Sequence, residues 1–480
     1  MSRYGVWAPT AFWLVAGVLC YVLAFPPMEW GTLAWLAPLC WFHMLEGRSA
    51  RQRFYLMLVT GYATSFATLY WLWPLFRTLT LILLFVPSLY FAAWGVMMRL
   101  PLSQSRIWRI TWPAVLWCGL EHLRGEWAPL SFSWIALGYS QVNQLGSLVA
   151  PVIGVYGISA LMVFWAALLL QWEPSVTRMK IARGCVLMLP IALACGHQRT
   201  YWEEPARTAL LHQLREQDEI TDVEEVDLKR SPDFIVWPEY ILNDDPFLRQ
   251  SSWFLDIMKR EAAGAKHGII FGASDYATSD TKRGAPFYNT AYMLDREGNL
   301  AAKAVKNKPI QLLPDGLPAK DITIITLPGT GTLGSPTEPI RLGVGICYDG
   351  SFQQFSRRMA ARGASVLCFP TCNMEAWGPV QHRQHQRMFQ MRAAETRLPV
   401  LTAAVSGPTF AAAPGGAVLT ELPFHKTDTL LVNFAPSNGS TPFTLGGWLL
   451  GPLCTFAIFA ALVFIGITRM VMPRMSNRRS

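Results

Sequence analysis

Long apolar runs separated by short polar loops occupy residues 1–196, and one more run lies near the end of the chain. Several runs reach the roughly 20 residues that an α-helix needs to cross a bilayer. The pattern therefore predicts an α-helical membrane bundle of about eight spans. The runs are Trp7–Phe25, Gly31–Leu45, Phe54–Phe76, Leu79–Leu100, Ile107–Leu123, Ser147–Trp172, Ile181–Gly196 and Leu445–Thr468.

Arginines and lysines are concentrated in every second loop between these runs. Positively charged loops mark the cytoplasmic side of a membrane protein. We therefore expect both chain ends in the cytoplasm and the segment after the seventh run outside. The residues are Arg48, Arg51 and Arg53, then Arg99, Arg106 and Arg109, then Arg178, Lys180 and Arg183, and finally Arg469, Arg474, Arg478 and Arg479.

The outside segment, residues 197–441, has a different pattern, in which short apolar strands alternate with charged amphipathic stretches. The alternation predicts an α/β domain with a core of its own. It divides the chain into a helical part at 1–196, this domain, and a final helix with a basic tail at 442–480. The expected strands are Thr208–His212, Phe234–Trp237, Gly268–Ala273, Asn289–Asp295, Ile340–Ile346, Ser365–Phe369 and Val400–Val405, and the expected helices are Ser251–Lys266 and Gln381–Thr396.

Composition supports a membrane protein and disfavours nucleic-acid binding. The 480 residues are 52% hydrophobic and only 15% charged, against about 25% charged in ordinary soluble domains. The net charge of +9 could indicate nucleic acid, but much of the basic excess lies in the membrane loops. Nine cysteines form no CxxC pair and no His/Cys metal spacing, so no zinc site is expected.

The first stretch with chemical potential is Arg341–Phe352, in which a buried strand runs directly into Cys347. A cysteine at the end of a strand can stand at a sharp turn with its sulfur available as a nucleophile. The alternative is a small buried hydrophobic residue, since free cysteine is among the most buried residue types.

Two more stretches could assist such a nucleophile. Phe234–Glu239 is an apolar strand that ends in Pro-Glu, and a partly desolvated carboxylate there can act as a general base. Lys303–Pro309 follows a hairpin-like turn, and a lysine beside a thiol can stabilise an oxyanion. Taken alone, the glutamate could be an exposed loop residue and the lysines a solvated basic loop.

Together these stretches place a glutamate after a strand, a lysine after a hairpin and a cysteine after a strand. This order resembles the nitrilase superfamily of carbon–nitrogen hydrolases. Ser365–Asn373 resembles the strand that follows the nucleophile, and Gln381–Thr396 resembles the helix that ends in Arg-Ala-x-Glu. Pro399–Ser406 is similar to a closing strand of that fold. The resemblance implies an α/β nitrilase-like αββα sandwich.

A nitrilase-like domain between the last two of eight spans resembles, in particular, the bacterial apolipoprotein N-acyltransferases. Cys347-Tyr348-Asp349 is similar to the Cys-Tyr-Glu of that family, and Pro309–Pro318 is similar to its Lys…Pro…Glu loop when aligned on Asp315. This alignment favours Lys306 as the catalytic lysine, with Lys308 as the competitor.

The resemblance implies specific roles for six residues. The catalytic set comprises Glu239, Lys306 and Cys347, and the supporting or substrate-binding set comprises Tyr348, Asp349 and Asp315.

The same resemblance implies an acyl transfer without cofactor or metal. The cysteine would take an acyl chain from a phospholipid and pass it, through a thioester, to the N-terminal amine of a diacylglyceryl lipoprotein. The protein would lie in the bacterial inner membrane among membrane lipids, with its catalytic domain in the periplasm. One alternative is a TraB-type conjugal transfer protein, whose nitrilase-like domain has an unknown or lost activity. Another is a membrane-tethered amidase for a small amide.

Overall fold

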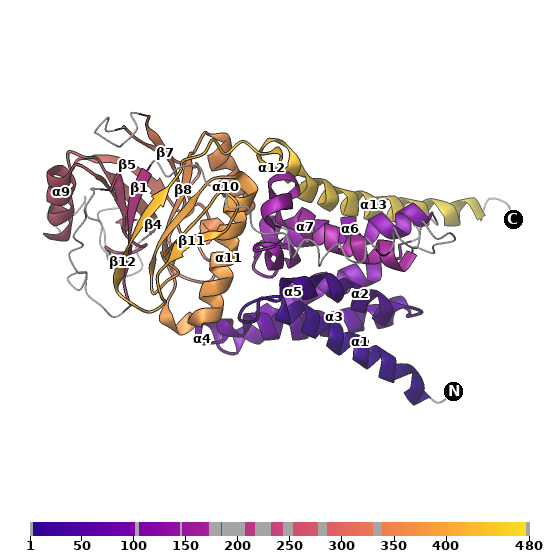
Figure 1. Ribbon diagram of the computed structural model, residues 1–480. Coiled ribbons are helices and arrows are strands. Elements are labelled where there is room, and N and C mark those ends of the chain that lie inside the picture. Colours follow the sequence, from indigo (N-terminus) through magenta and orange to yellow (C-terminus); the bar gives the residue numbers. More distant parts are fainter. Residues whose placement is uncertain are drawn as a thin grey trace. The chain divides into compact units, whose positions relative to one another are not determined.

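In the computed structural model, the chain forms two compact units, one helical and one built on β-sheets (Figure 1). The structure describes residues 3–100, 105–144, 146–171, 184, 207–216, 232–242, 253–276, 286–329 and 338–476. The helical unit comprises Met1–Leu145, Ile153–His197 and Gly446–Ser480, and the sheet unit comprises Gly146–Val152 and Gln198–Leu445.

The helical unit contains long apolar helices. They are α1 (Arg3–Leu23), α2 (Leu36–Leu45), α3 (Ala50–Leu69), α4 (Trp73–Phe76), α5 (Leu79–Met97), α6 (Arg106–His122), the main part of α7 (Gly146–Gln171) and α13 (Leu450–Ser476). The helix α3 begins directly after Ser49, because Ser49 and Gln52 cap each other's backbone N–H groups. The helices α3 and α5 approach closely through Gly61 and Gly95, as small residues allow between membrane helices.

Three helices of the described residues are long and apolar enough to cross a membrane: Leu79–Met97, Leu148–Gln171 and Gly447–Thr468. Pro9–Leu23 and Gly31–Leu45 are shorter apolar helices. The seventh expected span, Ile181–Gly196, lies outside the described residues except for Gly184. Membrane-spanning character is therefore supported, whereas the number of eight spans stays a prediction.

The sheet unit contains two six-stranded sheets, with strand orders β12-β1-β2-β3-β4-β5 and β11-β10-β9-β8-β7-β6. The strands of the first sheet are β1 (Arg207–Gln213), β2 (Phe234–Val236), β3 (Gly268–Tyr276), β4 (Phe287–Leu294), β5 (Leu300–Val305) and β12 (Asp428–Phe434). Those of the second are β6 (Ile324–Leu327), β7 (Ile340–Val344), β8 (Val366–Cys372), β9 (Val400–Val405), β10 (Phe410–Ala412) and β11 (Val418–Glu421).

The central strands of each sheet are parallel: β1, β2 and β3 in one, and β7, β8 and β9 in the other. The outer pairs are antiparallel. Parallel strands present their carboxyl ends at one edge of a sheet, which is the usual position for a site in α/β proteins. The chain leaves that edge after β2 toward Glu239 and after β7 toward Cys347.

The main hydrophobic core lies between the two sheets, since it combines Leu211 and Val236 from one sheet with Val344 and Leu401 from the other. The helix α9 (Trp253–Ala265) packs on the outer face of the first sheet. The helices α10 (Gln353–Ala361) and α11 (Gly378–Thr396) pack against strands of the second sheet. Figure 1 shows α9 on one outer side of the sheets and α10 with α11 on the other, so the unit is a four-layer αββα sandwich.

All seven expected strands and both expected helices are present, with ends shifted by a few residues. The edge strands β5, β6, β11 and β12 were not predicted, and neither were the short inner strand β10 and the helix α10. The strand β5 contains Lys303, which the sequence analysis placed in a basic loop. Edge strands are half exposed and weakly apolar, so their sequences carry little of the pattern that reveals a buried strand.

Candidate active site

The strand β7 delivers Cys347 to a sharp turn at the carboxyl edge of its sheet. Cys347 has a left-handed backbone (φ 46°), which costs a non-glycine residue on the order of 1–3 kcal/mol. Gly350 allows this turn to lie against α11, because a Cβ there would collide with the ring of Phe389. The Cys347 side chain is buried, and its Sγ lies 3.7 Å from the carbonyl oxygen of Cys372, to which the thiol donates. Cys347 is a free cysteine.

Glu239 follows β2 through Pro238 and is fully buried. The backbone turns immediately afterwards, because Tyr240 is also left-handed (φ 57°). This turn lies directly on β3, where a Cβ at Gly272 would come within 2.6 Å of the Glu239 Cα. Only glycine allows the two backbones to approach so closely, and the approach fixes where the Glu239 side chain begins.

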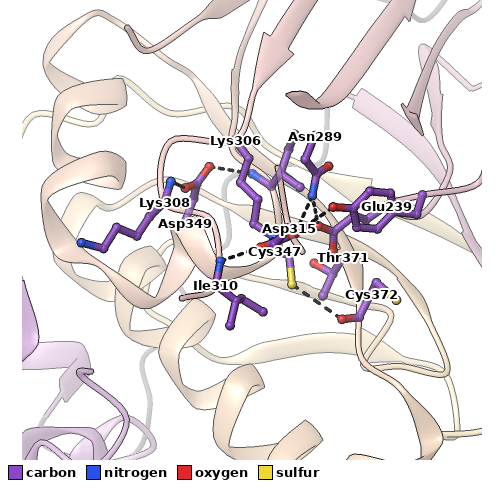
Figure 2. A network of polar contacts seen from close by, with 12 residues as sticks. Glu239, Asn289, Lys306, Lys308, Ile310, Asp315, Cys347, Asp349, Thr371 and Cys372 are labelled. Atoms are coloured by element: carbon purple, nitrogen blue, oxygen red, sulfur yellow. Dashed lines mark hydrogen bonds and ion pairs between the residues drawn. The ribbon is translucent and has the colours of Figure 1, made fainter. Parts of the chain in front are cut away.

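Lys306 follows β5 and places its ammonium group between two carboxylates (Figure 2). Its Nζ lies 2.8 Å from Glu239 Oε1 and 2.7 Å from Asp315 Oδ2. The Lys306 side chain is 1% exposed. The ammonium of Lys308, in contrast, points away from this group and lies 5.4 Å from the centre of the Phe352 ring. Of the two competing lysines, the structure therefore brings Lys306 to Glu239.

Asp315 supplies the second carboxylate. Besides Lys306, its oxygens accept hydrogen bonds from the Tyr240 hydroxyl at 2.8 Å and from the Ile310 backbone N–H at 2.6 Å. These contacts hold the loop that follows β5 over the site.

Asp349 connects the lysine loop to the cysteine turn. Its buried carboxylate accepts the backbone N–H groups of Asn307, Lys308 and Ile346 at 2.7–3.1 Å. Asp349 therefore holds backbone on both sides of the site. Tyr348, also in the expected set, is buried with its ring edge-on to Phe352.

Asn289, on β4, is a site residue that the sequence analysis missed. Its Nδ2 donates to Glu239 Oε1 at 2.6 Å and to Asp315 Oδ1 at 3.0 Å. An asparagine inside an apolar strand is the signal that could have revealed it, because a buried amide needs polar partners.

The buried charges shift one another's proton affinities. Burial raises the pKa of Glu239; Lys306 opposes this shift and Asp315 adds to it. Burial alone would lower the pKa of Lys306, but Glu239 and Asp315 outweigh it and hold that pKa well above its usual value. Burial also raises the pKa of the Cys347 thiol, and the charge of Glu239 raises it further. A neutral thiol therefore lies near a carboxylate with raised proton affinity and a permanent cation.

This arrangement suits acyl transfer, which needs a nucleophile, a base and a charge that stabilises an oxyanion. No group of three or more histidine, cysteine or acidic side chains that could hold a metal ion occurs among the described residues.

Comparison with known proteins agrees with the fold. Residues 197–440, more than half of the chain, match the carbon-nitrogen hydrolase family. The chain belongs to this family. Residues 16–168 match the apolipoprotein N-acyltransferase N-terminal domain, so both parts of the chain match the resemblance seen in the sequence.

Curated relatives are similar to this chain over most of their length. An apolipoprotein N-acyltransferase of Vibrio cholerae is 26% identical over 88% of this chain and 91% of that protein. Another, from Geobacter metallireducens, is 24% identical over 94% of each chain. A solved amidase of the nitrilase superfamily from Nesterenkonia is 18% identical and covers 51% of this chain and 95% of its own, with a TM-score of 0.37. None of these matches favours the conjugal-transfer alternative.

We expect Cys347 to be a neutral thiol at neutral pH, because its pKa is raised by burial and by Glu239. The ultraviolet thiolate absorbance of the protein minus that of Cys347→Ser measures this directly. The difference should be absent at neutral pH and should develop only above the ordinary cysteine pKa of about 8.5. A thiolate step near or below neutral pH would instead show a preformed thiolate–ammonium pair.

Lys306→Met should destabilise the protein more at about pH 8 than at about pH 5. Without the ammonium, two buried carboxylates lose their counter-charge, and the folded state favours their protonated forms. Their folded pKa values then exceed the unfolded ones, so stability is present at low pH and is lost as pH rises. Breaking a buried pair costs about 3–5 kcal/mol.

Lys308→Met is the matched control, since the Lys308 ammonium points away from the two carboxylates and lies over the Phe352 ring, a contact worth about 0.5–1 kcal/mol. Thermal unfolding in detergent at both pH values compares the two variants. Equal losses, or a Lys306→Met deficit that is the same at both pH values, would contradict the ion-pair geometry.

Proposed function

We propose that this chain is a membrane-bound N-acyltransferase that moves an acyl chain from a phospholipid, through a Cys347 thioester, to the N-terminal amine of a diacylglyceryl lipoprotein. The observation that carries the proposal is the ammonium of Lys306 bonded to both Glu239 and Asp315 beside the buried Cys347. The match of residues 16–168 to the apolipoprotein N-acyltransferase N-terminal domain supports the choice of substrates.

In the first half-reaction, Glu239 accepts the proton of the Cys347 thiol while the sulfur attacks the phospholipid ester carbonyl. The charge of Lys306 stabilises the oxyanion that forms. When the ester C–O bond breaks, Glu239 returns its proton to the departing alcohol, and a lysophospholipid leaves. The raised pKa of Glu239 suits both steps, since a general base works best with a pKa near the working pH.

In the second half-reaction, the neutral amine of the lipoprotein attacks the thioester. Glu239 takes a proton from the attacking nitrogen, Lys306 again stabilises the oxyanion, and the C–S bond breaks. Cys347 leaves as a thiolate and regains the proton from Glu239. Asp315 and Asp349 support these steps by holding Lys306 and the backbone around the site, and Tyr348 lies next to the nucleophile.

Water must be kept from the thioester for transfer to prevail over hydrolysis. The side chains of Cys347, Glu239 and Lys306 are each no more than 2% exposed, which supports a dry site. Membrane spans would present both lipid substrates to it.

The proposal extends to the position in the cell. Eight spans at 1–196 and 442–480 would anchor the protein in the bacterial inner membrane, with residues 197–441 as the catalytic domain on the periplasmic side. The alternating basic loops support this topology.

Cys347→Ser and Glu239→Gln should each abolish transfer. Serine is a poorer nucleophile, and glutamine keeps the shape of Glu239 without accepting a proton. Lys306→Met should lose on the order of 10²-fold in rate with the oxyanion charge. A labelled phospholipid should leave a hydroxylamine-sensitive acyl group on the wild type and none on Cys347→Ser.

Complementation of a strain depleted of its own lipoprotein N-acyltransferase identifies the acceptor. The wild-type gene should restore growth and the Cys347→Ser gene should not. If all three variants kept full activity, the site would have no catalytic role, as the conjugal-transfer alternative predicts. Release of ammonia from small amides without acyl transfer would favour an amidase.

A membrane-impermeant protease added to intact spheroplasts should cleave within residues 197–441 and leave both ends of the chain intact. The reason is the cytoplasmic position that the arginine-rich loops predict for the termini. Epitope tags at the two ends report their protection, and lysed spheroplasts provide the control. Cleavage of either tag before lysis would contradict the topology.

A further inference from the structure

One buried side chain outside the expected set touches three parts of the active site. Asn289 is fully buried on β4, between β3 and β5. Its backbone carbonyl accepts the Lys306 N–H at 2.9 Å, and its side-chain Nδ2 reaches both Glu239 and Asp315. Figure 2 shows its amide directed toward the two carboxylates.

We propose that Asn289 is the positioning residue of the general base: its amide fixes Glu239 Oε1, so that Oε2 is the oxygen that exchanges a proton with Cys347. Oε1 is occupied by Asn289 and Lys306 together. Oε2 has no hydrogen-bond partner among the described residues, which leaves it available for the thiol proton.

The Asn289 amide also stabilises two carboxylates that lie close together in a buried site. Glu239 and Asp315 share one cation, and each also accepts a hydrogen bond from the same Asn289 nitrogen. A hydrogen bond to a charged group is stronger than one between two neutral groups. Burial raises the pKa of Glu239, and the hydrogen bond from Asn289 opposes this rise, so the amide favours the ionised carboxylate that can act as a base.

The loss of Asn289 should therefore move the pH dependence of the Cys347 reaction. Acylation and alkylation of the thiol both require that the Glu239–Cys347 pair has lost one proton. Without the amide, Glu239 holds that proton to a higher pH. The acidic limb of each rate profile should shift upward by about one pH unit or more, which lowers the rate about tenfold below the limb. Alkaline pH should restore much of the rate.

The test uses two nearly isosteric substitutions in the full-length protein in detergent. Asn289→Leu removes both side-chain hydrogen bonds, and Asn289→Asp places a third carboxyl group between Glu239 and Asp315. Both should shift the limb to higher pH. Thr290→Val is the matched control, because it removes a buried hydroxyl from the adjacent position of the same strand. Among the described residues, this hydroxyl donates to the backbone carbonyl of Tyr288 and not to the site. Its profile should match that of the wild type.

The rate of Cys347 alkylation by iodoacetamide, followed by mass spectrometry, measures the profile without any lipid substrate. Acylation by a labelled phospholipid measures it for the proposed reaction, on which the catalytic meaning of the inference rests. If the wild type is alkylated but never acylated, the proposed function fails while the role of Asn289 is still decided.

An unchanged alkylation limb in Asn289→Leu would overturn the inference, as would a shift of the same size in Thr290→Val. If Asn289→Leu does not fold, the limb of Asn289→Asp decides alone. A lower rate with an unmoved limb would show that Asn289 serves only the fold.

Discussion

The site depends on one electrostatic constraint: a lysine ammonium buried between two carboxylates. Each of the three charges would be costly in this interior without the others. Lys306 therefore fixes where Glu239 and Asp315 can lie, and the two carboxylates keep Lys306 charged. Because the network is buried, its charges act on the Cys347 thiol with little screening by water.

Backbone geometry also holds this arrangement of charges in place. Cys347 and Tyr240 both adopt left-handed conformations, and Gly272 and Gly350 give their turns room against β3 and α11. Asp349 then ties the cysteine turn to the loop that carries Lys306 through hydrogen bonds from backbone N–H groups. A nucleophile, a base and a cation that are far apart in sequence are thus held in fixed relative positions.

The protonation of the thiol at rest bears on which molecules can react with it. Burial raises the pKa of the Cys347 thiol, which donates to the Cys372 carbonyl, and both effects disfavour a thiolate that oxidants or other electrophiles could attack. In the proposed mechanism, proton transfer to Glu239 and attack by the sulfur occur together once a carbonyl group lies near Lys306. This behaviour suits an enzyme whose acyl donor is an ordinary, weakly reactive ester.

Periodicity was enough to predict the helical membrane part, the α/β domain and seven of its strands. The choice of Glu239, Lys306 and Cys347 came from the order of their three stretches, which resembles the nitrilase superfamily. A strand that is buried on both faces has a continuous apolar run in its sequence. A polar residue at the end of such a run is then a candidate for the site. The number of membrane spans is still a prediction from the sequence.

Only the tertiary structure decided the rest. The alignment of one loop favoured Lys306 but left Lys308 as a competitor, because the choice depends on which side chain reaches Glu239 across the sheet. The place of Asn289 in the site could not be predicted for the same reason, since its partners Glu239 and Asp315 are 50 and 26 residues away along the chain. A sequence records which groups can form hydrogen bonds, whereas the pairing of strands decides which of those groups meet.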